Sequence, residues 1–220
     1  MRRRSFFRVA GATVAASTLV LAGCGDDPKI EPTDTGTVIS IGDGENGLLN
    51  YVYLLEQLEA TFYQKIVDAK PAFLSAAELT AITDLRDHEV IHREFFKQLL
   101  GGNAIGTFEF NFSTLTLTTR TGVLEAARLL EDLGVAAYNG AAKLITTKNT
   151  LVLLGKIASV EARHAAFIHD LLGIDPFADV VAATGADAGL GPALTPAQVI
   201  TAAAPFFLPY TIDVSGLPLA

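Results

Sequence analysis

Two segments of this chain each carry a Glu-x-x-His motif, and a single Glu stands 30 residues before each motif. The first set is Glu59, Glu89 and His92, and the second set, 72 residues later, is Glu131, Glu161 and His164. A Glu and a His three positions apart share one face of a helix, so both can bind one metal ion. Four carboxylates and two imidazoles from four helices are the ligand set of carboxylate-bridged two-metal sites in helix bundles.

Each of these residues interrupts a row of apolar side chains that are spaced three and four positions apart, as in packed helices. In the second predicted helix, for example, Ile82, Leu85 and Phe96 continue the row that contains Glu89. Carboxylates buried at one level of a core repel one another and lose hydration. No Lys or Arg stands in the four rows, whereas two divalent cations would balance four carboxylates. The alternatives are that the Glu residues face solvent, or that the site is degenerate or holds one metal.

Glu89 and Glu161 are the candidates to bridge the two metals. Glu59 with His92, and Glu131 with His164, could then complete the two coordination spheres. Carboxylate and imidazole ligands suit iron or manganese and are acceptable to zinc. Six protein ligands on two ions leave open positions for dioxygen, peroxide or water. We therefore expect two metal ions as the cofactor, with iron first and manganese second.

Four neighbours are candidates to support the ligands: Tyr63, Tyr138, Asp132 and Arg163. Tyr138 lies seven residues after Glu131, where it could hydrogen-bond a ligand, carry an oxidising equivalent or simply pack in the core. Tyr63, one turn after Glu59, has the same options. Asp132 and Arg163 could form an ion pair around the ligands or on the surface.

For the other polar residues near the motifs we expect positions outside the ligand set. Glu56 could be an extra ligand, but we expect a solvated carboxylate or one that supports the ligands. His88 and His169 fall outside the apolar rows and fit surface histidines. Gly134 and Ala127 are small, so the third helix leaves room for a small oxidant.

The lengths of the connections predict the topology. Helices are expected over about 46–69, from Ser75 to the glycines at 101–102, over 121–145, and from about 150 to Gly173. Short, long and short links predict an all-α bundle of two antiparallel hairpins joined by one crossover, the ferritin-like arrangement. In the crossover, Phe108, Phe110 and Phe112 alternate with polar residues and should lay one apolar edge on the bundle. Residues 174–220 form a C-terminal extension, with a short helix after Thr195 that ends before Pro205.

Composition narrows the class of protein further. The chain has 220 residues, 50% of them apolar and 18% charged, which fits one globular domain. Its formal net charge is −8 and no basic stripe is present, so nucleic acid is excluded as a partner. Cys24 is the single cysteine, which rules out an intrachain disulfide and a thiolate metal cluster.

The N-terminus has the pattern of an export signal. The basic run Arg2–Arg8 resembles a twin-arginine signal, and the apolar stretch that follows is too short to span a bilayer. Leu21–Cys24 resembles a bacterial lipobox, so residues 1–23 would be removed and Cys24 would carry lipid. Residues 24–45 then read as a tether without regular structure, and the protein would be anchored in the bacterial cell envelope, outside the cytoplasm. An ordinary secretory signal and an uncleaved helical anchor remain alternatives.

The motifs resemble those of bacterial ferritin-like domain proteins related to the desiccation-associated proteins of plants. The resembling stretches lie in all four helices, at 55–63, 87–92, 131–138 and 160–165, within a domain over residues 46–173. The resemblance implies a ferritin-like fold with a di-iron or related two-metal centre. It does not imply a defined reaction.

Two classes of function follow. The first is a two-metal oxidoreductase that acts on dioxygen, peroxide or ferrous ion at the outer face of a bacterial membrane. The second is a non-catalytic stress or desiccation protein whose metals stabilise the bundle. A storage cage is disfavoured by the tether and the C-terminal extension, and a rubrerythrin-like electron-transfer chain by the lack of further cysteines. The sequence is compatible with a monomer and with a homodimer.

Overall fold

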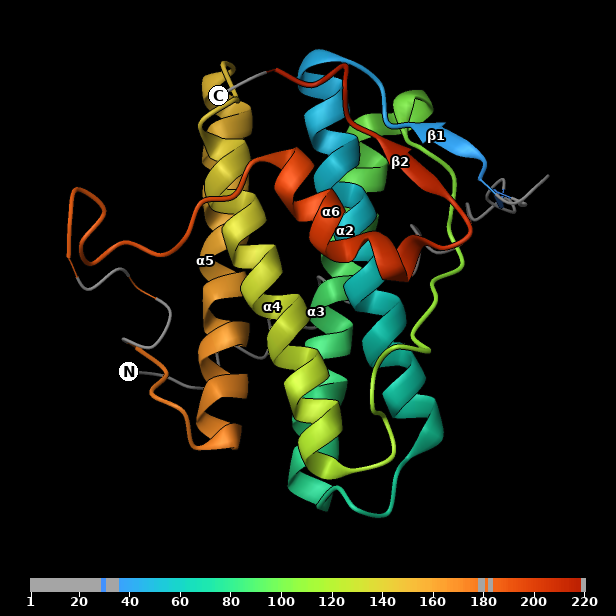
Figure 1. The fold of residues 1–220 in the computed structure, drawn as a ribbon, viewed down its shortest axis with the longest axis vertical. Helices are drawn as coiled ribbons and strands as arrows, with labels where there is room; N and C mark the ends of the chain where they lie inside the picture. The colour runs from blue at the N-terminus through green and yellow to red at the C-terminus, as the bar shows by residue number, and fades with distance from the viewer. Residues whose placement is uncertain (1–28, 31–35, 178–180, 182–183, 219–220) are drawn as a thin grey trace, which may run out of the picture.

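Four long helices lie side by side: α2 (Gly44–Ala69), α3 (Ala76–Leu100), α4 (Arg120–Ala142) and α5 (Lys148–Leu172) (Figure 1). This computed structural model describes residues 29–30, 36–177, 181 and 184–218. α2 packs mainly on α3, and α4 on α5. Short turns close these two hairpins, and one long crossover joins them. The predicted all-α bundle is therefore confirmed, with helix bounds within a few residues of those expected.

Local sequence explains where the helices begin and end. α3 starts at the predicted capping box, in which the Ser75 side chain accepts from Glu78 N and the Glu78 carboxylate accepts from Ser75 N. α5 stops at Gly173, whose φ of 72° is left-handed and favours glycine. Arg120 at the start of α4 joins two other helix ends, because it binds the Glu78 carboxylate at 2.6 Å and the carbonyl of Leu171 at 2.9 Å.

Two amide side chains of α2 hold the crossover in place. Asn50 donates to the Asn103 carbonyl at 2.9 Å and accepts from Ile105 N at 3.0 Å. Gln57 donates to the Gly106 carbonyl at 3.3 Å and accepts from Phe108 N at 3.2 Å. The two amides thus satisfy backbone groups of a segment that lies outside the long helices.

The apolar side chains of the crossover pack as the alternation predicts. Phe108 and Phe112 are buried, and the more exposed Phe110 packs on the same core. The aromatic rings continue onto the C-terminal extension, since Phe112 lies 6.2 Å from Phe206 between ring centroids. The crossover is therefore sandwiched between α2 and the last part of the chain.

The C-terminal extension returns over the bundle. α6 (Pro196–Phe207) lies across the long helices and contacts α4, and the strand β2 (Thr211–Asp213) pairs in parallel with β1 (Val38–Ser40) (Figure 1). The expectation that α6 ends before Pro205 is wrong, because the helix continues to Phe207 with the proline in its last turn. The expectation of a tether without regular structure is wrong for Val38–Ser40, which the distant Thr211–Asp213 orders by backbone pairing.

No helix in the described part of the chain is long and apolar enough to cross a membrane. The predicted export signal and Cys24 lie outside the described residues.

Candidate metal centre

Acidic and imidazole side chains from all four long helices meet inside the bundle. Glu56 comes from α2, Glu131 from α4, and the two Glu-x-x-His pairs from α3 and α5. Glu56, Glu89, Glu131 and Glu161 have no solvent exposure, and the two imidazoles are buried with only a slight exposed edge. Burying six ionisable groups in one core costs hydration free energy that a compensating charge must offset.

These side chains form two overlapping groups with the spacing of metal ligands. The first group is Glu56, Glu89, His92 and Glu161, and the second is Glu89, Glu131, Glu161 and His164; the ligand atoms of each lie within 4.8 Å of one another. Glu89 and Glu161 belong to both groups. Each group also has one carboxylate and one imidazole of its own. The arrangement would suit two adjacent cations that share Glu89 and Glu161 as ligands.

The closest approaches within the two groups mirror each other. His92 Nδ1 lies 2.7 Å from Glu161 Oε1 and 3.4 Å from Glu56 Oε2. His164 Nδ1 lies 2.7 Å from Glu89 Oε1 and 3.7 Å from Glu131 Oε2. Each imidazole therefore lies closest to the bridging carboxylate of the opposite helix, and both rings present Nδ1 to the cluster.

Many of these atoms have no hydrogen-bond partner among the described residues. They are Glu56 Oε2, Glu89 Oε1, Glu131 Oε2, both carboxylate oxygens of Glu161, and His164 Nδ1. His164 Nδ1 and Glu89 Oε1 lie 2.7 Å apart, yet neither atom has a partner with the geometry of a hydrogen bond in the described part of the chain. An unsatisfied buried polar atom costs about 1–3 kcal/mol. A pair of divalent cations would satisfy all of them, so the residues fit a two-metal centre.

The electrostatics show the same need for positive charge. Burial and the charge of Glu161 raise the pKa of Glu56 and Glu59 well above 4.5, and burial and the charge of Glu89 raise the pKa of Glu131. Burial would lower the pKa of His92, but the carboxylates of Glu161, Glu56 and Glu89 outweigh it and raise that pKa to about 12. Without metal, protons must therefore hold this cluster together.

The pKa values of the imidazoles and of Glu89, one of the two shared carboxylates, shift in opposite directions. Burial lowers the pKa of His164, but Glu161 and Glu89 outweigh burial and raise it to about 10. Burial raises the pKa of Glu89, but His164 and His92 outweigh burial and lower it to about 2. Glu89 is thus ionised at neutral pH, opposite the two imidazoles.

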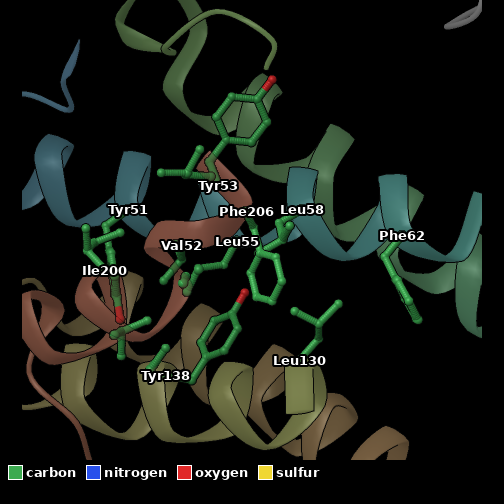
Figure 2. Packing of buried hydrophobic residues seen from close by; sticks show 14 of the residues in the cluster. Tyr51, Val52, Tyr53, Leu55, Leu58, Phe62, Leu130, Tyr138, Ile200 and Phe206 are labelled. Carbon is green, nitrogen blue, oxygen red and sulfur yellow. The ribbon is translucent and has the colours of Figure 1, made fainter. Parts of the chain in front are cut away.

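Two tyrosines support the outer carboxylates by exchanging hydrogen bonds between helices. Tyr63 of α2 donates to Glu131 Oε1 of α4 at 2.5 Å, and Tyr138 of α4 donates to Glu56 Oε1 of α2. Figure 2 shows Tyr138 reaching from α4 towards α2, with Leu55 and Leu130 beside it. Both tyrosines are buried and keep their protons, because burial raises their pKa values well above 10. Each orients the carboxylate of the opposite hairpin.

Glu56 and Glu59 have the opposite of the roles that we expected. Glu56 is neither solvated nor a distant support, since it belongs to the first ligand group, whereas Glu59 belongs to neither group. Glu59 is nevertheless buried beside the cluster, and a Cβ at Gly134 would lie 2.8 Å from its Oε1. The expected room for an oxidant at Gly134 is therefore wrong, because the Glu59 side chain fills it.

A repeat in the sequence could have identified Glu56. The segment Leu54-Leu55-Glu56-Gln57-Leu58 returns as Leu129-Leu130-Glu131-Asp132-Leu133, and a Tyr follows each Glu by seven residues. This repeat has an offset of 75 residues rather than 72. It pairs Glu56 with Glu131 and Glu59 with Gly134, as the structure does.

The surroundings of Asp132, Arg163, His169 and His88 also differ from expectation. The predicted Asp132–Arg163 pair is not observed, because Arg163 is exposed and Asp132 instead lies 2.9 Å from His169 Nε2 and 3.5 Å from Arg128 Nη1. His169 is buried at 2% exposure rather than lying on the surface. His88 is exposed as expected, but its Nδ1 lies 2.9 Å from His164 Nε2.

Comparison with known proteins adds one positive result. A family model described as a ferritin-like domain matches residues 44–174, which span the four long helices and every residue of the two ligand groups. A search of curated proteins found no match to the chain.

Proposed function

The chain belongs to the ferritin-like domain family, and we propose that it is an oxidoreductase with a carboxylate-bridged pair of iron or manganese ions. The proposed substrates are dioxygen, peroxide or ferrous ion. The observation that carries this proposal is that the two ligand groups share Glu89 and Glu161. Shared carboxylates hold two ions close enough to act on one small molecule.

The protein side chains divide the work between binding and shielding. Glu56 and His92 serve one ion, Glu131 and His164 serve the other, and the bridging pair serves both. When bound, the ions would supply Lewis acidity and one-electron chemistry. Tyr63 and Tyr138 hold the outer carboxylates in place, and the apolar core excludes water and large molecules. Only a small substrate fits such a buried centre.

The decisive experiment measures oxidation of ferrous ion by purified protein, with dioxygen and with hydrogen peroxide in separate runs. The wild type should oxidise bound ferrous ion faster than buffer does, and Glu161→Ala should lose this acceleration because it removes a shared ligand. Glu94→Ala is the matched control, since Glu94 lies on the exposed side of α3, outside both ligand groups, and pairs with Arg93. Equal rates in the wild type and Glu161→Ala would contradict the proposal.

A metal-stabilised, non-catalytic protein is the second candidate. The complete burial of four carboxylates favours it, because a closed site hinders exchange of substrates. The same samples separate the two functions. Added metal that raises the melting temperature without any acceleration of ferrous oxidation would support the structural role.

We also propose that the protein acts in the bacterial cell envelope, held by lipid on Cys24 after removal of residues 1–23. The support is the Arg-rich start and the Leu21–Cys24 pattern. Expression of the full chain should place wild-type protein in the membrane fraction, and Cys24→Ser should release it or leave it unprocessed. Wild-type protein that is soluble with an intact N-terminus would contradict this location.

A further inference from the structure

We propose that His88 is a positioning residue for one of the two metal sites, the one that uses His164. The proposal rests on the two-metal function above. It adds that the two ions differ in their surroundings, although each is bound by the same types of ligand. It assigns a role to a solvent-exposed side chain that lies outside both ligand groups.

The contact itself is direct. His88 Nδ1 lies 2.9 Å from His164 Nε2, and the two ring centroids are 5.1 Å apart with an angle of 25° between the ring planes. His164 turns its other nitrogen, Nδ1, towards Glu89 and the second ligand group. One imidazole thus links the buried cluster to an exposed side chain.

The direction of the hydrogen bond follows from the role of His164. A neutral imidazole that offers Nδ1 to a metal carries its proton on Nε2. Nε2 of His164 is then the donor and Nδ1 of His88 is the acceptor. This bond fixes both the tautomer and the ring orientation of His164, as partners of metal-binding histidines do.

The other metal site has no equivalent support among the described residues. His92 makes its close contacts through Nδ1, with Glu161, Glu89 and Glu56. The residue 72 positions after His88, which would serve His92 by the offset of the two motifs, is Val160. Valine cannot accept a hydrogen bond. Loss of His88 should therefore weaken the second site and leave the first unchanged.

Cobalt(II) titration tests this, because cobalt gives a visible absorption that counts bound ions. Wild type should bind two ions. His88→Leu, which removes the acceptor but keeps the bulk, should weaken one of them by roughly 10–100-fold. His88→Asn keeps an acceptor oxygen at the same position and should bind both ions within a few-fold of wild type.

Two backgrounds identify the affected ion. In Glu56→Ala, which lacks an outer ligand of the first group, His88→Leu should weaken the remaining ion. In Glu131→Ala, which lacks an outer ligand of the second group, His88→Leu should change nothing. A metal-free readout supports these titrations: the ring Nε2 proton of His164 should give a slowly exchanging NMR signal in wild type and His88→Asn, but not in His88→Leu.

Three results would overturn the proposal. They are equal affinities in wild type and His88→Leu, equal losses in His88→Leu and His88→Asn, and a loss that persists in the Glu131→Ala background. Wild-type protein that binds fewer than two cobalt ions would instead refute the two-metal centre on which the proposal rests.

Discussion

The two hairpins of the bundle are close copies at the candidate metal centre and differ beside it. Each supplies an outer Glu, a Glu-x-x-His pair and a Tyr that supports the outer Glu of its partner. Beside the ligands, Glu59 in α2 faces Gly134 in α4, and His88 in α3 corresponds to Val160 in α5. The α2–α3 hairpin therefore holds both additional polar groups.

This difference separates the residues that both halves of the site require from those that can vary between the halves. The four duplicated carboxylates, Glu56, Glu89, Glu131 and Glu161, each have an oxygen without a hydrogen-bond partner among the described residues, so both halves must keep them. The unmatched residues act on one side only. Two ions bound by the same ligand set are thus expected to differ in affinity and in local charge, and the following changes probe that expectation.

Glu89→Ala should have the largest effect, because it removes a ligand from both groups at once. Addition of ferrous or manganous ion should raise the melting temperature of the wild-type protein by mass action. The variant should lose most of that gain. Thermal melts with and without metal measure it, with Glu94→Ala as the control on the same helix. An unchanged gain in Glu89→Ala would show that Glu89 binds neither ion.

The pH dependence of the metal-free protein should come next. The pKa of Glu56 and Glu131 is raised by folding, as is that of His164, to about 10. Groups with raised pKa values in the folded state bind more protons there than in the unfolded chain, so stability falls as pH rises. We expect the melting temperature to drop by roughly 5–10 °C between pH 6 and pH 9, at about 2–4 °C per kcal/mol.

Two controls make the pH experiment specific. Saturating metal should flatten the fall, since cations replace the protons. At the acid end, the pKa of Glu89, lowered to about 2, predicts that its own stabilising contribution is lost only as pH falls from about 4.5 towards 2. A metal-free protein that becomes more stable from pH 6 to pH 9 would contradict the protonated cluster.

Gly134→Ala should have an intermediate effect and tests the first difference between the hairpins. Alanine favours a helix over glycine by about 1 kcal/mol, but here its Cβ would lie 2.8 Å from Glu59 Oε1. In Glu59→Ala the obstacle is gone and the helical preference should reappear. A double-mutant cycle by chemical denaturation should give a coupling of roughly 1–2 kcal/mol. Additive effects would mean that Glu59 does not occupy the space above Gly134.

Tyr63→Phe and Tyr138→Phe should have the smallest and, by symmetry, similar effects. Each removes one hydrogen bond to a buried carboxyl and should cost about 0.5–1.5 kcal/mol in free energy of unfolding. Denaturation of the two variants under one set of conditions makes the comparison. A cost at only one of the two tyrosines would show that the reciprocal bonds are unequal and that the hairpins differ even at their shared residues.

The sequence predicted those parts of the fold that depend on local spacing. The apolar rows, the capping box at Ser75 and the lengths of the links give the helices and the crossover, because each is encoded within a few residues. The pairing of Val38–Ser40 with Thr211–Asp213 was not predictable in this way, since short strands carry little pattern and their partner lies far along the chain.

The candidate site was predicted in part for a similar reason. A Glu-x-x-His spacing determines a helix face, so the residues of α3 and α5 could be assigned directly. Glu56 and Glu59 lie three residues apart on α2, and both suit one broad face. Only the tertiary packing, with Gly134 opposite Glu59, separates them. His169 was misplaced because its partner Asp132 belongs to another helix.

The parallel pair β1–β2 has a consequence for the order of folding. It joins segments about as far apart in sequence as this fold allows, through three register pairs from Val38↔Thr211 to Ser40↔Asp213. Closing so long a loop costs entropy that local helical contacts do not, and non-local pairings form slowly. We expect the pair to form after the hairpins and to open first, so its amides should exchange with solvent well before those of α2 and α4. Its protection against hydrogen exchange would then report the last step of folding.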